Sequence, residues 1–224
     1  MLRVLITFLS LLALALPSAA QPRSDGLGAV PPTPPRSSKP KRALAPTELV
    51  AELRWGGNIL YFRHAGTDFS QNDAKSQGPT DCANQRNLTD KGRADARAIG
   101  KALRELAIPV GQVLASPMCR TDETAKLIFG KAEPSEAVRG DPAFPSTDPR
   151  RYEQLRRILV TPVPARTNLG IASHGNPFHG VAGPPYIAEG ELAVIKPRNA
   201  DFEVVARVRP EDWPRIISAV HPRK

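Results

Sequence analysis

NILYFRH, residues 58–64, is the stretch of this sequence that decides the fold. Its first five residues form a run rich in strand-forming side chains, bounded by Gly56-Gly57 on one side and by charge on the other. A run that is apolar on both faces is typical of a buried strand in a parallel sheet. Residues 113–115 and 169–172 have the same apolar character. We therefore expect three central strands.

Helical patterns alternate with these strands. We expect one helix over 48–55, capped by Thr47, and a second that begins after Thr89. Further helices are expected over 121–129, 151–159 and 211–220, and an adjacent strand pair over 192–195 and 202–208. In the second helix, the apolar residues on one face are Ala98, Ile99, Ala102, Leu103 and Leu106. The alternation predicts an α/β fold with a mostly parallel sheet covered by helices on both faces.

Each of the three apolar strands is followed by polar residues that a core does not need. Arg63-His64 follow the first strand, residues 116–120 (SPMCR) the second, and residues 173–176 (SHGN) the third. In open α/β sheets, ligands bind beyond the carboxyl ends of the strands. We therefore expect Arg63, His64, Arg120 and His174 to surround one crevice.

These four side chains suit phosphoryl transfer. Arginine pairs bidentately with phosphate oxygens, and a neutral imidazole such as that of His64 is a competent nucleophile toward phosphorus. A second histidine, His174, would be protonated and stabilise charge on the transferring group. The scheme requires no metal and no cofactor.

Four sequence blocks resemble the signatures of a known family. FRHAGTD, QRNLTDKGRADARAIGKAL, VLASPMCRTDETAKLIFG and IASHGNP occur in this order and are similar to those of the histidine phosphatase superfamily. The resemblance covers about residues 57–197 and implies a three-layer αβα sandwich that is phosphoglycerate-mutase-like. It also implies that His64 becomes phosphorylated between Arg63, Arg120 and His174. The chain is most similar to small exported bacterial members that carry a cysteine in the second and third blocks.

The proton donor to the leaving group is not marked by these blocks. Members that place an aspartate directly after the second histidine differ from this chain, which has Gly175 there. Glu189, shortly before a predicted strand, is the preferred candidate, and Asp68 is the next. Thr67 is a candidate donor to phosphate, and Arg86 either contacts the substrate or forms a surface ion pair.

Several residues receive a structural interpretation. Cys82 and Cys119 form either a disulfide or two buried free thiols, because their spacing does not fit a zinc site. Trp55 and Trp213 are expected to pack in the core. His179 is expected to be structural.

The first 46 residues are set apart by composition. Residues 1–20 have a basic start, an apolar run too short to span a bilayer and small residues before a cleavage point, which predicts a signal peptide rather than a retained anchor. Residues 21–46 are rich in proline and basic residues and predict a disordered linker. Residues 47–224 then form the domain. The protein is expected to be periplasmic or extracellular, without stable membrane insertion.

The predicted function is that of an exported, metal-independent phosphomonoesterase acting through phospho-His64. Its substrate would be a phosphorylated small molecule or envelope component, held in a pocket walled by loops 65–86 and 131–150. The formal net charge is +9, but the basic residues are scattered and aromatics are only 5%, which argues against nucleic acid. The alternatives are a catalytically weak phosphate- or phosphosugar-binding module of the envelope and a phosphotransferase or mutase. The sequence does not indicate an oligomeric state.

Overall fold

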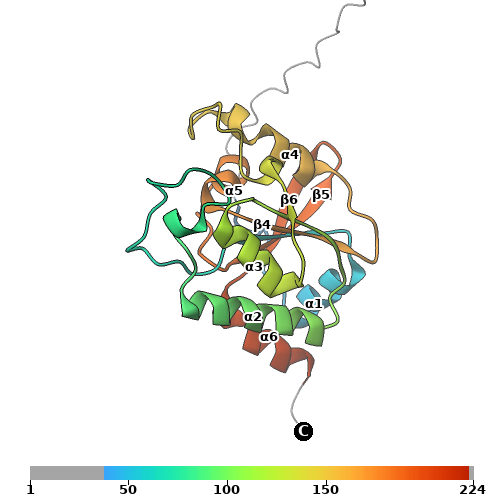
Figure 1. The fold of residues 1–224 in the computed structure, drawn as a ribbon. Coiled ribbons are helices and arrows are strands. Elements are labelled where there is room, and N and C mark those ends of the chain that lie inside the picture. Colours follow the sequence, from blue (N-terminus) through green and yellow to red (C-terminus); the bar gives the residue numbers. More distant parts are fainter. Residues whose placement is uncertain (1–37, 222–224) are drawn as a thin grey trace, which may run out of the picture. The chain divides into compact units, whose positions relative to one another are not determined.

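A six-stranded sheet forms the centre of the domain in the computed structural model, which describes residues 38–221 (Figure 1). The strands are β1 (Ile59–Arg63), β2 (Val110–Ala115), β3 (Glu133–Pro134), β4 (Asn168–Ser173), β5 (Leu192–Arg198) and β6 (Asp201–Val208). Their order is β3-β2-β4-β1-β5-β6. The pairs β1–β4, β2–β4 and β2–β3 are parallel, whereas β5 is antiparallel to both β1 and β6. The mostly parallel sheet and the adjacent β5–β6 pair are thus confirmed.

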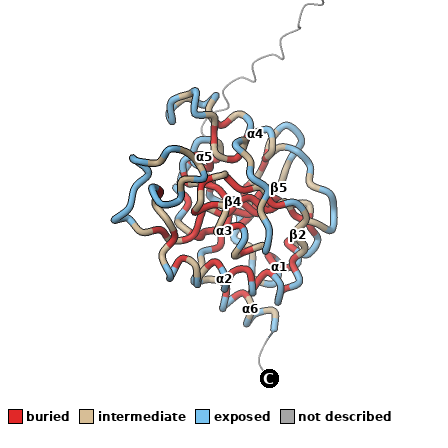
Figure 2. The backbone as a smooth tube through the Cα atoms, in the orientation of Figure 1, coloured by how far each residue is buried: buried red, intermediate tan, exposed pale blue. Residues whose placement is uncertain are grey.

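Helices cover both faces of the sheet. The helices are α1 (Pro46–Trp55), α2 (Asp90–Glu105), α3 (Cys119–Phe129), α4 (Glu153–Val160), α5 (Gly175–Ala182) and α6 (Trp213–Val220). In β1, Leu60 and Phe62 pack into a core shared with α1, α2 and α6, while Ile59 and Tyr61 pack into a second core with α4 and α5. Figure 2 shows this buried sheet in red between the two helical layers. The αβα sandwich is therefore confirmed, with Trp213 packed in the first core.

The ends of the helices are set by local capping interactions and proline positions rather than by the apolar pattern. The predicted cap of α2 is confirmed, because Thr89 Oγ1 accepts a hydrogen bond from the backbone N–H of Gly92. Helix α1 begins two residues earlier than predicted, with Pro46 in its first turn and the Glu48 carboxylate accepting from Ala45 N. Helices α4 and α6 begin two residues later than predicted, each after a short 3₁₀ turn.

Some predictions about packing and extent were wrong or incomplete. Trp55 lies at the end of α1 and is 70% exposed, so it does not pack in the core. Ala98 lies on the exposed side of α2. Strand β3 and helix α5 were not predicted as elements, because β3 has only two exposed residues and α5 carries glycine, asparagine and proline in its first turn.

Ser38, within the predicted linker, packs against the domain. Ser38 is fully buried, its hydroxyl donates to Pro185 O, and its backbone N–H donates to Pro184 O. The segment 38–45 therefore differs from the disordered linker expected there. The predicted signal peptide and residues 21–37 lie outside the described residues. Between residues 38 and 221, no helix combines the length and apolar character needed to cross a membrane.

Candidate active site

Three adjacent strands of the sheet end at one site. Strands β2, β4 and β1 lie side by side and parallel, and Ser116, His174 and His64 follow them directly. The His64 and His174 ring centroids are 5.6 Å apart. The His64 backbone N–H donates to Ser173 O, which extends the β1–β4 ladder to the histidine itself. The sheet therefore brings the two predicted histidines together, as expected from its parallel order.

His64 is held with one ring nitrogen bonded and the other available. Its Nδ1 lies 3.0 Å from Ala65 O, and because a carbonyl can only accept, the proton sits on Nδ1. Nε2 then carries the lone pair. The ring is 2% exposed, and burial lowers the pKa of His64 to about 3, assisted by the charges of Arg120, Arg63 and Arg86. His64 is therefore a neutral imidazole at physiological pH.

His174 differs from its predicted charge state. Burial, followed by its neighbours His64 and Arg120, lowers the pKa of His174 well below 6.5. Its Nε2 shares a 2.8 Å hydrogen bond with Ser116 Oγ, and Tyr61 Oη donates to its backbone carbonyl. His174 is therefore neutral in this structure rather than protonated, and the positive charge of the site comes from arginines.

Three arginines around His64 have donors without acceptors. The Nε atoms of Arg63, Arg86 and Arg120 are buried and have no hydrogen-bond partner among the described residues. A buried donor left unpaired is unfavourable, and all three of these arginines line the cavity, where a bound anion would supply acceptors to their guanidinium groups. Arg86 lines the cavity, and its Nη2 also lies 3.9 Å from Glu189 Oε1, so its ion pair is partly buried and leaves the predicted substrate contact open.

A cavity of about 360 Å³ opens at these side chains. It lies within the size range of small-molecule sites. Both predicted loops contribute to its wall, Asp73, Ser76 and Gly78 from the first, and Arg139 and Ser146 from the second. The five residues expected at the site, Arg63, His64, Arg86, Arg120 and His174, all line it.

Glu189 is not placed as a proton donor. Its Oε1 accepts from Thr67 Oγ1 at 2.7 Å and from Arg63 Nη2 at 3.1 Å, and its Oε2 accepts from Thr67 N at 3.0 Å. Neither Glu189 nor Thr67 lines the cavity. These contacts speak against both predicted roles, because Thr67 holds Glu189 and Glu189 pairs with Arg63, although Glu189 Oε1 also lies 3.9 Å from His64 Nδ1. Asp68, the second candidate donor, bonds to Ser70 and Gln71 and also does not line the cavity.

Asp73 is the carboxylate that the sequence did not single out. Among the described residues it is the one Asp or Glu that lines the cavity. Its Oδ1 accepts from Arg120 Nη1 at 3.0 Å and from Arg86 N at 2.8 Å, while its Oδ2 makes no hydrogen bond within the described chain. A Cβ on Gly175 would lie 2.3 Å from the Tyr186 side chain, so a side chain at position 175 would require this exposed ring to move.

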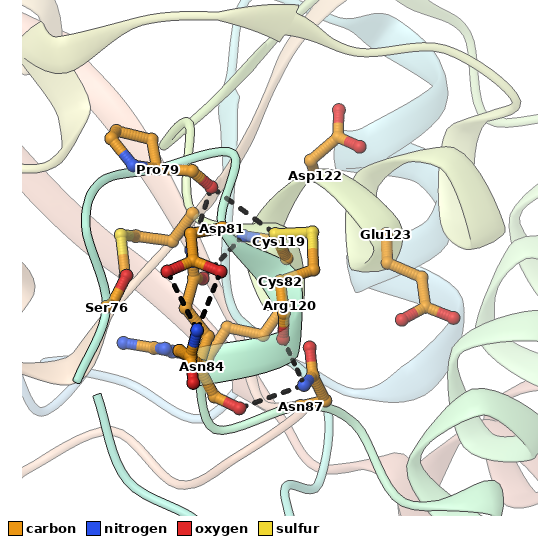
Figure 3. The surroundings of a disulfide bond; sticks show 12 residues. Ser76, Pro79, Asp81, Cys82, Asn84, Asn87, Cys119, Arg120, Asp122 and Glu123 are labelled. Carbon is orange, nitrogen blue, oxygen red and sulfur yellow. Dashed lines mark hydrogen bonds between the residues drawn. A yellow bond between two sulfur atoms is a disulfide. The ribbon is translucent and has the colours of Figure 1, made fainter. Parts of the chain in front are cut away.

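A disulfide ties the loop that carries Asp73 to the helix that carries Arg120. Cys82 and Cys119 are bonded, which confirms the first of the two predicted alternatives. Figure 3 shows Arg120 next to the bridge at the start of α3. Gln85 reinforces the link, since its Oε1 accepts from Cys119 N. Both sides of the Asp73–Arg120 ion pair are thereby fixed.

Three more cavity residues were not predicted. Arg139 and Tyr186 lie in segments without periodicity, and Arg151 begins an expected helix, so no sequence pattern marked these three as site residues. His179 does not line the cavity, and it lies exposed on α5 with its ring centroid 5.6 Å from that of Tyr186. No cluster of His, Cys, Asp and Glu suited to a metal ion occurs over residues 38–221.

The geometry and the sequence define the same class of protein. The family model of the histidine phosphatase superfamily (branch 1) matches residues 59–160, which include His64 and Arg120. This match supports the histidine phosphatase superfamily with its phosphoglycerate-mutase-like fold and, at a coarse level, a phosphatase-type enzyme.

Solved structures of similar proteins include two SixA proteins. The protein histidine phosphatase SixA complexed with tungstate is 18% identical, with a TM-score of 0.49 over 69% of this chain and 98% of that one. A putative phosphohistidine phosphatase SixA from Agrobacterium tumefaciens is 15% identical, with a TM-score of 0.49 over 70% and 100% of the two chains. A phosphoserine phosphatase mutant from Entamoeba histolytica with phosphoserine is 13% identical, with a TM-score of 0.49 over 69% and 98%. No curated protein matches the chain.

Proposed function

We propose that this chain is an exported, metal-independent phosphomonoesterase that works through a phosphohistidine at His64. The observation that carries the proposal is the set of three buried, unpaired arginine Nε donors around a neutral imidazole. A phosphoryl group in the cavity would supply acceptors to the guanidinium groups of Arg63, Arg86 and Arg120, which line it, and an electrophile for His64 Nε2. Preorganised guanidinium groups also stabilise the charge that spreads over the phosphoryl oxygens during transfer.

The first step forms a bond from His64 Nε2 to phosphorus and breaks the bond from phosphorus to the ester oxygen. Arg63 and Arg120 hold the group in line, and Glu189 keeps Arg63 oriented through its 3.1 Å contact. The leaving alcohol takes its proton from Asp73, the one cavity-lining carboxylate of the described chain. Because phosphate oxygens compete for Arg120, substrate binding weakens the ion pair that stabilises the Asp73 carboxylate.

The second step returns the enzyme to its starting state. A water molecule attacks phosphorus and loses its proton to the Asp73 carboxylate, and the bond from phosphorus to His64 Nε2 breaks. Inorganic phosphate leaves with His64 neutral again. Neither step uses a metal, since the arginines carry the positive charge and Asp73 carries the proton.

Export is supported by two features of the chain. Residues 1–20 have the composition of a signal peptide, and a disulfide is typical of proteins that fold in an oxidising compartment. We place the enzyme in the periplasm or outside the cell, where its substrate is a phosphorylated small molecule or envelope component.

The test compares two histidine variants of the purified chain with p-nitrophenyl phosphate as substrate, in the presence and absence of a chelator. His64→Ala is expected to lower kcat by on the order of 10³-fold or more, because the nucleophile is gone. His179→Ala is the matched control, since this exposed histidine does not line the cavity. Rapid quenching with labelled substrate should trap an acid-labile phosphoprotein in wild type and not in His64→Ala.

Each alternative function predicts a different result. A binding module would take up inorganic phosphate and release no p-nitrophenol, and a transferase would pass the phosphoryl group to an added alcohol in preference to water. Loss of activity in the chelator, or full activity in His64→Ala, would contradict the mechanism.

A further inference from the structure

We propose that Arg139 and Arg151 form a second anion-binding subsite in the cavity. The substrate is then a small phosphomonoester whose leaving group carries a further carboxylate or phosphate. This inference rests on the proposed function, because it assigns the part of the substrate that remains after the phosphoryl group has been placed on His64. It names the chemical class of that part.

The charge of the cavity exceeds what one phosphoryl group requires. Five arginines line it, and Asp73 is the one carboxylate among its described lining residues. Arg63, Arg86 and Arg120 hold the buried, unpaired Nε atoms and surround His64. The remaining two, Arg139 and Arg151, come from the separate segment 136–152, and we assign them to the part of the bound molecule beyond the phosphoryl group.

These two arginines are weakly neutralised. Arg139 lies 3.4 Å from Glu136, which is 56% exposed, so that ion pair is screened by solvent. Arg151 donates to the backbone carbonyl of Phe144, and no carboxylate among residues 38–221 lies within ion-pair distance of it. A cleft whose wall carries mainly positive charges concentrates anions. Arginine pairs bidentately with both carboxylate and phosphate.

The wall that carries the two arginines is fixed in place. Tyr152, next to Arg151, is 4% exposed, and its ring packs against Gly140 and Gly180 so closely that a Cβ at either glycine would lie under 3 Å from it. Asp141 N donates to Arg151 O at 2.8 Å, and Ser173 Oγ donates to Val138 O, one residue before Arg139. Since Ser173 directly precedes His174, the second subsite is anchored to the catalytic strand β4.

The test uses substrates that differ by one charge. 4-Carboxyphenyl phosphate and 4-carbamoylphenyl phosphate have nearly the same size, and 1,4-phenylene bisphosphate places a second phosphate at the same position. Wild type is expected to favour the carboxylate over the amide by about tenfold in kcat/KM, as one charge-assisted pair would give. The bisphosphate arm shows which anion fits better.

Variants of the wall locate the preference. Arg139→Gln and Arg151→Gln should each reduce the carboxylate-to-amide ratio, and the double variant should bring it close to one. Arg150→Gln is the matched control, because Arg150 is exposed, pairs with Asp148 and does not line the cavity. It should keep the wild-type ratio. Turnover of the amide ester shows that each variant is folded.

Calorimetric titration of His64→Ala with the same esters separates the two proposals. If His64→Ala binds the carboxylate ester ten times more tightly than the amide ester while wild type hydrolyses neither, the proposed function is overturned. The subsite proposal is then still supported. Hydrolysis with a ratio near one in wild type, or with a ratio that survives the double variant, would overturn the subsite alone.

Discussion

Asp73 and Arg120 form the contact that a substrate has to rearrange. Asp73 Oδ1 accepts from Arg120, and its Oδ2 has no partner within the described chain, so this oxygen is the one placed to carry a transferable proton. Asp73→Asn is expected to lower kcat/KM for an alkyl phosphate by roughly 10²–10⁴-fold. The loss on p-nitrophenyl phosphate should be much smaller, because its leaving group needs little protonation.

Asp68→Asn is the control for this comparison, since Asp68 lies in the same loop outside the cavity. It should affect both substrates equally little. Glu189→Gln should lower kcat/KM for both substrates by a similar factor, because Glu189 acts through Arg63. A leaving-group-dependent loss in Glu189→Gln instead of Asp73→Asn would return the donor role to Glu189.

The pH dependence follows from the same pair. Burial raises the pKa of Asp73, but the Arg86 backbone N–H and the Arg120 guanidinium outweigh it, so the pKa lies below 3.8. The protonated donor therefore becomes more abundant as pH falls, while His64, with a pKa of about 3, stays neutral. The ratio of kcat/KM for the alkyl ester to that for the nitrophenyl ester should rise from pH 7 to pH 4, and Asp73→Asn should make it flat.

Elements differ in how far their sequence predicts them. Strand β1 and the positions of Arg63, His64, Arg120 and His174 were predictable, because an apolar run marks each strand and the chemistry follows directly at its end. Asp73 was not, since it meets Arg120 across 47 residues through a loop without periodicity. For Glu189, the position in the chain was predictable but the direction of the carboxylate was not.

The position of Glu189 shortly before β5 suggested that its carboxylate points toward the substrate. Which way its carboxylate turns depends on Thr67 and Arg63, which are more than 120 residues away in sequence. Side-chain orientation of this kind is set by tertiary contacts, and no spacing rule encodes it.

The first turn of α2 supports the nucleophile loop by direct backbone contact. A Cβ on Gly92 would lie 2.1 Å from Gly66 O, and Gly66 follows the His64-Ala65 pair. Gly92→Ala is therefore expected to displace this loop and to lower kcat. It should also lower the free energy of unfolding by about 1–3 kcal/mol. The measurements are steady-state kinetics and urea unfolding.

Ala94→Gly, an exposed site on the same helix, is the control. It should lower the free energy of unfolding by about 1 kcal/mol through helix propensity alone and leave kcat unchanged. Equal loss of activity in the two variants would show that helix stability, and not the glycine contact, controls the loop.

At the scale of the whole domain, the site depends on segments that the sheet alone does not hold. Strands β1, β2 and β4 fix both histidines, whereas Asp73 and Arg86 lie between β1 and α2, outside the sheet. The Cys82–Cys119 bridge connects this region to α3. We therefore expect this covalent bond to couple global stability to activity.

Removing the bridge tests this coupling. The two cysteines are 37 residues apart, and closing a loop of that length stabilises a folded chain by about 3–4 kcal/mol through the entropy of the unfolded state. At about 2–4 °C per kcal/mol for a chain of this size, the Cys82→Ser/Cys119→Ser variant should melt roughly 10 °C lower. Its kcat should also fall well below the melting transition, because Asp73 and Arg120 lose their shared anchor. Dithiothreitol should reproduce both effects in wild type and change nothing in the variant. If reduction releases two titratable thiols while the melting temperature and kcat stay at their starting values, the bridge contributes to neither, and the hydrogen bonds of Gln85 and Asp73 are enough to hold the loop.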